Sequence, residues 1–200
     1  RSLSPAAPGQ LVQVVPGAGT NVPVWLLGSS TYSARLAAKL GLPFAFASHF
    51  APELLLQAIQ IYRSSFEPSR FGAKPYVMTG VPIIAAETDE QAAYLATSPA
   101  LRFLKLIRGQ PIFTPPPVAT MDGLWSPIER QVVESKLKAA IVGGPETIRR
   151  KLTVFLNDTQ ADELIFTSDI YDHAMRLQSF EIAATAMKTI ASQAYTMQEI

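Results

Sequence analysis

The stretch that decides the fold runs from residue 24 to residue 50 and reads VWLLGSSTYSARLAAKLGLPFAFASHF. Its first four residues are apolar and suit a short buried strand, and a helix is predicted from Ser30 to Leu40. Gly41 and Pro43 end that helix, and residues 44–47 form a second buried strand. This order predicts a strand–helix–strand unit of a parallel sheet.

The same alternation continues along the rest of the chain. Helices are expected from residue 52, after Thr88 with an interruption near Pro99, over 127–137, after the turn 143–146, and over 172–190. Strands are expected over 76–86, 140–142 and 163–167. Pro82 predicts an edge position or a bulge for the strand 76–86. The segment 109–127, which contains three consecutive prolines, is interpreted as an irregular insertion or lid.

These elements define an α/β fold of parallel βα units, whose ligand site is expected beyond the carboxyl ends of the strands. The predicted organisation is an irregular segment 1–22, a single domain 23–192 and a C-terminal tail 193–200. Because the chain does not begin with Met, processing or truncation is expected.

Composition excludes several functional classes. A formal charge of +1 with no basic tract argues against a nucleic-acid or anionic-membrane surface, and no apolar run approaches the roughly 20 residues that span a bilayer. The absence of cysteine excludes disulfides, thiolate nucleophiles and Cys-based zinc sites. We therefore expect a cytoplasmic protein without nucleic-acid or membrane partners.

The turn Gly28-Ser29-Ser30 joins a strand to a helix amino terminus, where unpaired N–H groups and small residues suit an anion such as a phosphate. Serine is equally favoured there as an ordinary N-cap, which is the more common role. The turn Gly143-Gly144-Pro145-Glu146 offers the same choice, and a proline and an acid in its first turn favour the structural role.

Two histidines follow predicted strands. His49 ends the stretch quoted above, and His173 lies close to Asp169 and Asp172. Either could carry a proton or orient a ligand, although satisfied surface histidines are the more frequent case. Their spacing does not support a metal site, so none is expected. The carboxylate pairs of the chain are interpreted as solvated turn residues.

The chain resembles the luciferase-like flavin monooxygenase family, in its bacterial alkanal-monooxygenase-like branch. The resemblance rests on VPVWLLGSSTYSARLAAKLGLPFAFASHF and its continuation to Ser69, on YVMTGVPIIAAETDEQAAYLATS, on LWSPIERQVVE, and on the segments VGGPETIRRKL and TQADELIFTSDIYDHAMRLQSFEI. It implies a (β/α)8 TIM barrel, a homodimer, reduced FMN or less commonly a deazaflavin, O2, a small organic substrate and a possible flavin reductase partner.

The resemblance also implies site residues. Gly28, Ser29, Ser30 and Ser33 correspond to the loop that grips the flavin phosphate, and Ala47 and Ser48 to a wall near the flavin. His49 is a catalytic candidate by position alone.

The resemblance covers the carboxyl-terminal half of the family, so an incomplete barrel is expected. The chain is then either a fragment or a truncated relative that pairs with another chain to cover its sheet edges. Two other functions stay open: a catalytically silent flavin-binding or barrel-pairing subunit, and a non-flavin binding protein for phosphorylated small molecules.

Overall fold

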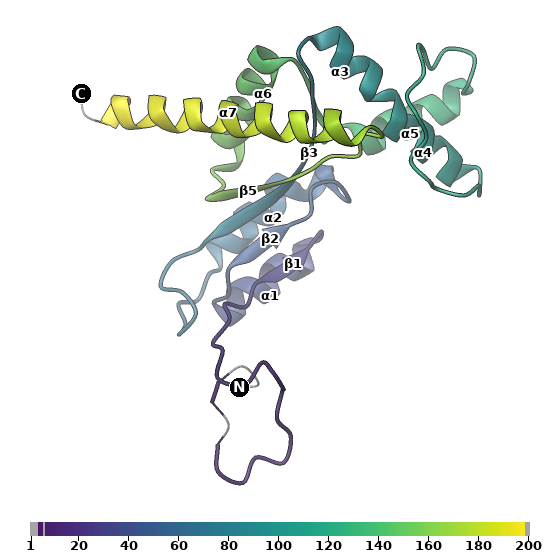
Figure 1. Ribbon diagram of the computed structural model, residues 1–200. Helices are drawn as coiled ribbons and strands as arrows, with labels where there is room; N and C mark the ends of the chain where they lie inside the picture. Colours follow the sequence, from purple (N-terminus) through teal and green to yellow (C-terminus); the bar gives the residue numbers. More distant parts are fainter. Residues whose placement is uncertain (1–3, 6, 199–200) are drawn as a thin grey trace.

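A computed structural model describes residues 4–5 and 7–198 of the chain (Figure 1). Its strands are β1 (Leu26–Gly28), β2 (Phe44–Phe46), β3 (Val77–Ala85), β4 (Ile141–Gly143) and β5 (Glu163–Thr167). Its helices are α1 (Thr31–Leu40), the 3-10 turn η1 (Pro52–Leu54), α2 (Leu55–Ser64), α3 (Asp89–Leu95), α4 (Thr97–Ile107), α5 (Pro127–Leu137), α6 (Pro145–Thr159) and α7 (His173–Gln198). The expected alternation of strands and helices is confirmed.

The described strands form one open parallel sheet in the order β1-β2-β3-β4, with β5 also paired to β3. The prediction of an edge position for β3 is wrong, because β3 is central. Pro82 is tolerated there because it lies between the residues that pair with β2, 77–79, and those that pair with β4, 83–85. The proline therefore falls where one partner strand gives way to another.

Helices cover one face of the sheet. Phe44, Phe46 and Val77 pack against α1 and α2, while Val81 and Ile83 pack against α6 and α7. Figure 1 shows α1 and α2 beside β1 and β2, and α6 and α7 beside β3 and β5. These two clusters hold the strands in register and fix the positions of their carboxyl ends.

The opposite face of the sheet is covered by helix only near the carboxyl end of β3, where Ile84 packs against α3; over β1 and β2 it carries no helix in the described structure. Leu27, Ala45 and Met78 lie side by side on it through the registers of β1, β2 and β3. Leu27 is 70% exposed and Ile165, on the same face in β5, is 53% exposed. The sheet is thus an incomplete barrel, as expected, and part of the face opposite α1, α2, α6 and α7 exposes apolar side chains.

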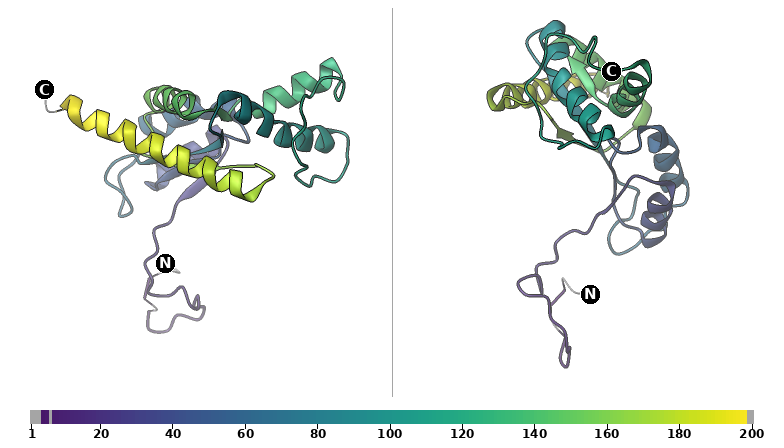
Figure 2. Two further views of the ribbon diagram at one scale, coloured as in Figure 1. Left: turned by 45° about the horizontal axis from the view of Figure 1, so that its top comes forward. Right: turned by 90° about the vertical axis from the view of Figure 1, so that its right-hand side faces the viewer.

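Two segments leave the body of the molecule. Residues 7–23 carry no helix or strand and extend away from the sheet in both further views (Figure 2). The helix α7 runs to Gln198, past the predicted end at residue 190 and into the predicted tail 193–200. Residues 191–198 contain no glycine or proline, so nothing in the sequence ends the helix there.

Candidate functional site

The hydrogen bonds of the turn after β1 are those of an ordinary helix N-cap. Ser30 Oγ accepts the N–H of Ser33, and Ser33 Oγ accepts the N–H of Ser30, both at 3.3 Å. Ser33 Oγ also donates to the carbonyl of Ser30 at 2.7 Å. A Cβ on Gly28 would lie 2.1 Å from Ser33 Oγ, so glycine is what allows the helix to sit against the strand end.

The same turn also keeps groups that suit an anion. The first turn of α1 contains no acidic residue. Its leading N–H groups have no partner within the helix, and they carry the positive end of the helix dipole. The Ser29 hydroxyl makes no hydrogen bond within the described part of the chain. A phosphate therefore fits this turn chemically, in addition to the cap that is already formed.

The end of β2 lies beside this turn. The N–H of Ala47 donates to the carbonyl of Gly28 at 2.9 Å, which brings the two predicted parts of the site together. Ser48 is 1% exposed, and its hydroxyl donates to the carbonyl of Gly80 in β3. The Ser48 hydroxyl is therefore engaged in joining two strands, and Ser48 can contribute only as a wall.

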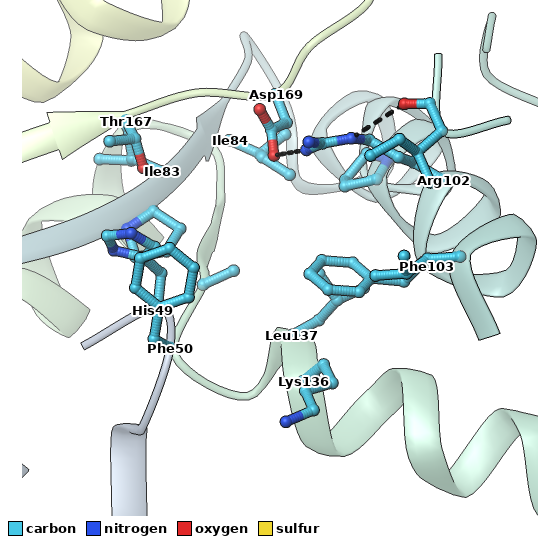
Figure 3. A pocket seen from close by; sticks show the side chains of 15 residues that line it. His49, Phe50, Ile83, Ile84, Arg102, Phe103, Lys136, Leu137, Thr167 and Asp169 are labelled. Carbon is cyan, nitrogen blue, oxygen red and sulfur yellow. Dashed lines mark hydrogen bonds and ion pairs between the residues drawn. The ribbon is translucent and has the colours of Figure 1, made fainter. Parts of the chain in front are cut away.

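His49 faces a different place from the serines. It is half-buried and lines a cavity of about 520 Å³ that none of Gly28, Ser29, Ser30 or Ser33 reaches. Its Nδ1 is buried and has no hydrogen-bond partner among the described residues. The rings of His49 and Phe50 lie 4.2 Å apart, centroid to centroid, and form one wall (Figure 3).

The second histidine is not part of this site. His173 is exposed at the start of α7, and its Nδ1 lies 2.8 Å from Nη2 of Arg176. Asp172 accepts the N–H of Met175 at 2.9 Å, as a helix-capping residue does. Asp169, in contrast, lines the cavity and is more than a solvated turn residue.

The cavity is apolar with one ion pair. Ten of its fifteen lining residues are apolar, contributed by β3, α4, the end of α5 and the loops around them. Arg102 in α4 pairs with Asp169 after β5, with Nη1 and Oδ2 2.9 Å apart, and its Nε donates to the carbonyl of Ile112 at 3.3 Å. Phe103 points into the space from the opposite side to His49 (Figure 3).

A second ion pair joins the end of α4 to α5, the two helices that contribute residues to the cavity. Arg108, after α4, binds both carboxylate oxygens of Glu129 in α5, at 2.7 and 3.0 Å. This bidentate contact, followed by the N–H of Ser126, lowers the pKa of Glu129 to about 2. The irregular segment between α4 and α5 is thereby closed at its base, and it supplies Ile112 to the cavity.

The turn before α6 resembles the turn before α1 but is already filled. The N–H of Gly144 donates to Oδ1 of Asp89 at 2.7 Å, and the Thr147 hydroxyl donates to Oδ2 at 3.0 Å. These two hydrogen bonds, that of Gly144 first, lower the pKa of the Asp89 carboxyl below its usual range. A carboxylate of the chain itself occupies the place that an anion would take.

Of the residues that shape the cavity, the sequence pointed to His49 but not to the ion pair. Arg102 and Asp169 are 67 positions apart, so no local motif contains them. A further signal was the irregular, proline-rich segment after α4, which was predicted to be an insertion or lid and which supplies Ile112 to the cavity. In the described residues, no group of three or more His, Asp or Glu side chains is arranged to hold a metal ion, and no helix is long and apolar enough to span a membrane.

The chain matches the family model of the luciferase-like monooxygenases over residues 4–163. It is 50% identical over 176 residues to the luciferase-like monooxygenase of Escherichia coli (strain K12), covering 88% of this chain and 52% of that protein. The chain thus spans about half the length of the curated relatives it matches.

Solved structures give the same fold. The chain superposes on apo-MsnO8 with a TM-score of 0.75 at 27% identity, covering 90% of this chain and 55% of that one. The oxygenating constituent of 3,6-diketocamphane monooxygenase from Pseudomonas putida, solved in complex with FMN, superposes with a TM-score of 0.56 at 19% identity, covering 86% and 50%. At that identity the second likeness concerns the fold alone.

Proposed function

Because the chain belongs to the luciferase-like monooxygenase family, we propose that it is the carboxyl-terminal half of an FMN-dependent monooxygenase that oxidises a small organic substrate with O2. Reduced flavin, when bound, supplies the reaction with O2. The residues of this chain bind the cofactor, orient the substrate and exclude water. The observation that carries the proposal is the placement of an anion-compatible helix terminus and an apolar cavity at the same end of one parallel sheet.

The proposed cofactor contacts follow the order of the strands. Ser29, Ser30 and the first N–H groups of α1 would hold the phosphate, with Gly28 and Ser33 keeping the turn tight. Ala47, beside that turn, would form part of the wall along the ring. FMN is the proposed flavin and a deazaflavin is the alternative, since each carries a phosphate group on the chain attached to its ring system.

His49 is the proposed proton-handling or ligand-orienting group. It lies at the end of the strand that carries Ala47, and its ring borders the cavity in which the substrate would sit. Its Nδ1 has no hydrogen-bond partner among the described residues, and this buried atom lies beside Gly80 of β3. A homodimer, a flavin reductase partner and a cytoplasmic location are further parts of the proposal.

The phosphate assignment is tested by comparing FMN with riboflavin, which lacks the phosphate. We expect FMN to bind the chain at least about tenfold more tightly, since charge-assisted hydrogen bonds are each worth roughly 1.5–3 kcal/mol. Ser30→Asp should remove this preference, because aspartate still caps a helix but repels a phosphate. Ser30→Asn, an equally good cap without the charge, is the control and should keep the preference.

Flavin fluorescence quenching measures both affinities. A Ser30→Asp variant that still prefers FMN over riboflavin to the wild-type extent would refute the phosphate site. Circular dichroism of both variants checks that α1 and the fold are intact.

A second candidate function is a catalytically silent subunit that binds flavin or completes a barrel. The exposed Leu27 and Ile165, on the part of the sheet that no helix covers in the described structure, favour it, because exposed apolar surface is typical of a site that a partner covers. Such a subunit would bind FMN without turnover in the presence of any flavin reductase, whereas the enzyme would consume O2.

A further inference from the structure

The ion pair between Arg102 and Asp169 sits in the wall of an otherwise apolar cavity, and it decides what charge the cavity can accept. Arg102 is one-third exposed and Asp169 about half exposed, with side-chain values of 34% and 52%. Both are counted among the lining residues, and Figure 3 shows them facing one another across the upper wall. The pair is therefore in contact with whatever occupies the cavity.

The guanidinium of Arg102 is held from two sides. Asp169 accepts from Nη1, and the carbonyl of Ile112 accepts from Nε. Asp169 neutralises the charge of Arg102, and Asp169 and Ile112 together accept from two of the five N–H donors of the guanidinium. A carboxylate that entered the cavity would have to compete with Asp169 and would lose its own hydration in an apolar space.

The remaining walls favour an uncharged, apolar group. Phe50 and Phe103 approach from opposite sides, and Leu137 closes the space from α5 (Figure 3). Lys136 is the remaining cation of the lining, but it is exposed, and its ammonium points away from Arg102 and Asp169 in Figure 3. Its charge stays in water, where it is screened.

We propose that this cavity binds the uncharged, largely apolar part of the organic substrate, and that Asp169 is a specificity-determining residue because it neutralises Arg102 and so excludes substrates with a carboxylate at this position. That the bound molecule is a substrate rests on the proposed function. The charge preference of the cavity does not, since it follows from its lining.

The experiment compares two probes of equal ring size, 2-acetylnaphthalene, which is uncharged, and 2-naphthoate, which carries a carboxylate. Binding to the 200-residue chain is measured by titration calorimetry without flavin. We expect the wild-type chain to bind the ketone at least about tenfold more tightly than the carboxylate. Asp169→Asn should strengthen naphthoate binding by about tenfold, because it frees the charge of Arg102, and should leave ketone binding nearly unchanged.

Two variants serve as matched controls. The double variant Arg102→Gln, Asp169→Asn has neither charge and should return to the wild-type preference for the ketone, which also shows that its cavity is intact. Lys136→Gln should leave the affinities for both probes unchanged.

Three results would overturn the proposal. They are equal or tighter binding of naphthoate by the wild-type chain, equal weakening of both probes in Asp169→Asn, and no binding of either probe to the wild-type chain. The titration of FMN against riboflavin is independent of these measurements. Loss of the FMN preference with an intact ketone preference would contradict the proposed cofactor site and leave the charge selectivity of the cavity standing.

Discussion

Gly28 ends β1 and Gly143 ends β4, and each glycine lies against a hydroxyl-bearing residue of the helix that follows. A Cβ on Gly28 would lie 2.1 Å from Ser33 Oγ, and a Cβ on Gly143 would lie 2.5 Å from Thr147 Cγ2. In both turns the missing side chain lets the helix start close to the strand end. The two turns therefore have the same strand–glycine–helix arrangement at the carboxyl edge of one sheet.

They differ in what occupies the helix terminus. The α1 turn is capped by its own serines and has no acid in its first turn. The α6 turn begins with Pro145, carries Glu146, and receives the carboxylate of Asp89 from the start of α3, 55 positions earlier than Gly144. The comparison teaches that a glycine turn before a helix does not by itself make an anion site, because a distant side chain can fill it.

Replacing Gly28, the glycine of the α1 turn, should have the largest effect on stability. Gly28→Ala places a Cβ 2.1 Å from Ser33 Oγ and 2.3 Å from Ser33 Cβ, and Ser33 is held by the cap. We expect a loss of about 1–3 kcal/mol in the free energy of unfolding, the usual cost of overpacking. Urea denaturation measures it.

The double variant Gly28→Ala, Ser33→Gly removes the clash and is the control. It should be more stable than Gly28→Ala, although glycine within a helix has its own cost of roughly 1 kcal/mol. A single variant as stable as the wild type would show that the close approach of α1 to β1 is not required.

Opening the filled turn should have a smaller effect. Asp89→Ala removes the two carboxylate oxygens, one of which accepts from the Gly144 N–H and the other from the Thr147 hydroxyl. The start of α6 then has no side chain that accepts its hydrogen bonds. We expect a lower melting temperature than the wild type, and an intermediate value for Asp89→Asn, whose amide oxygen can still accept from Gly144. Equal melting temperatures of wild type and Asp89→Ala would mean that water caps this terminus equally well.

Much of this architecture was predictable from the sequence, because its signals are local. The apolar runs, the serine caps and the glycine and proline breaks placed most helices and all five described strands close to their observed positions. The first strand was predicted two residues early, since Val24 and Trp25 are apolar but pairing with β2 begins at Leu26. The centrality of β3 was missed because Pro82 is a strong local signal for an edge.

The candidate site was predictable only in part. Gly28 to Ser33 and Ala47 to Ser48 lie within one strand–helix–strand unit, so their proximity follows from the order of the elements. The cavity does not follow from the order of the elements, because Arg102 in α4 and Asp169 after β5 come into contact only through tertiary packing. The engagement of the Ser48 hydroxyl with Gly80, and of Asp89 with Gly144, is likewise invisible to any short sequence window.

Acid should affect the two turns differently, and this is the smallest expected effect. The N–H of Gly144 and then the Thr147 hydroxyl hold the pKa of Asp89 below its ordinary value of 3.8. The ionised carboxylate therefore stabilises the fold fully above about pH 3.8, and this contribution is lost as the pH falls through the lower pKa of the folded state. The turn at Gly28 to Ser33 contains no titratable acid and should not respond.

The measurement is the free energy of unfolding of the wild type minus that of Asp89→Asn between about pH 6 and pH 2.5. The difference should be constant above pH 4 and shrink below it, because asparagine does not titrate. Protonation of Glu129, whose pKa is about 2, weakens the contact between α4 and α5 in the same acidic range. Because Glu129 is present in both the wild type and Asp89→Asn, its contribution cancels in the difference. A difference that stayed constant down to pH 2.5 would show that the charge of Asp89 contributes nothing to closing the α6 turn, and that the two turns differ in shape alone.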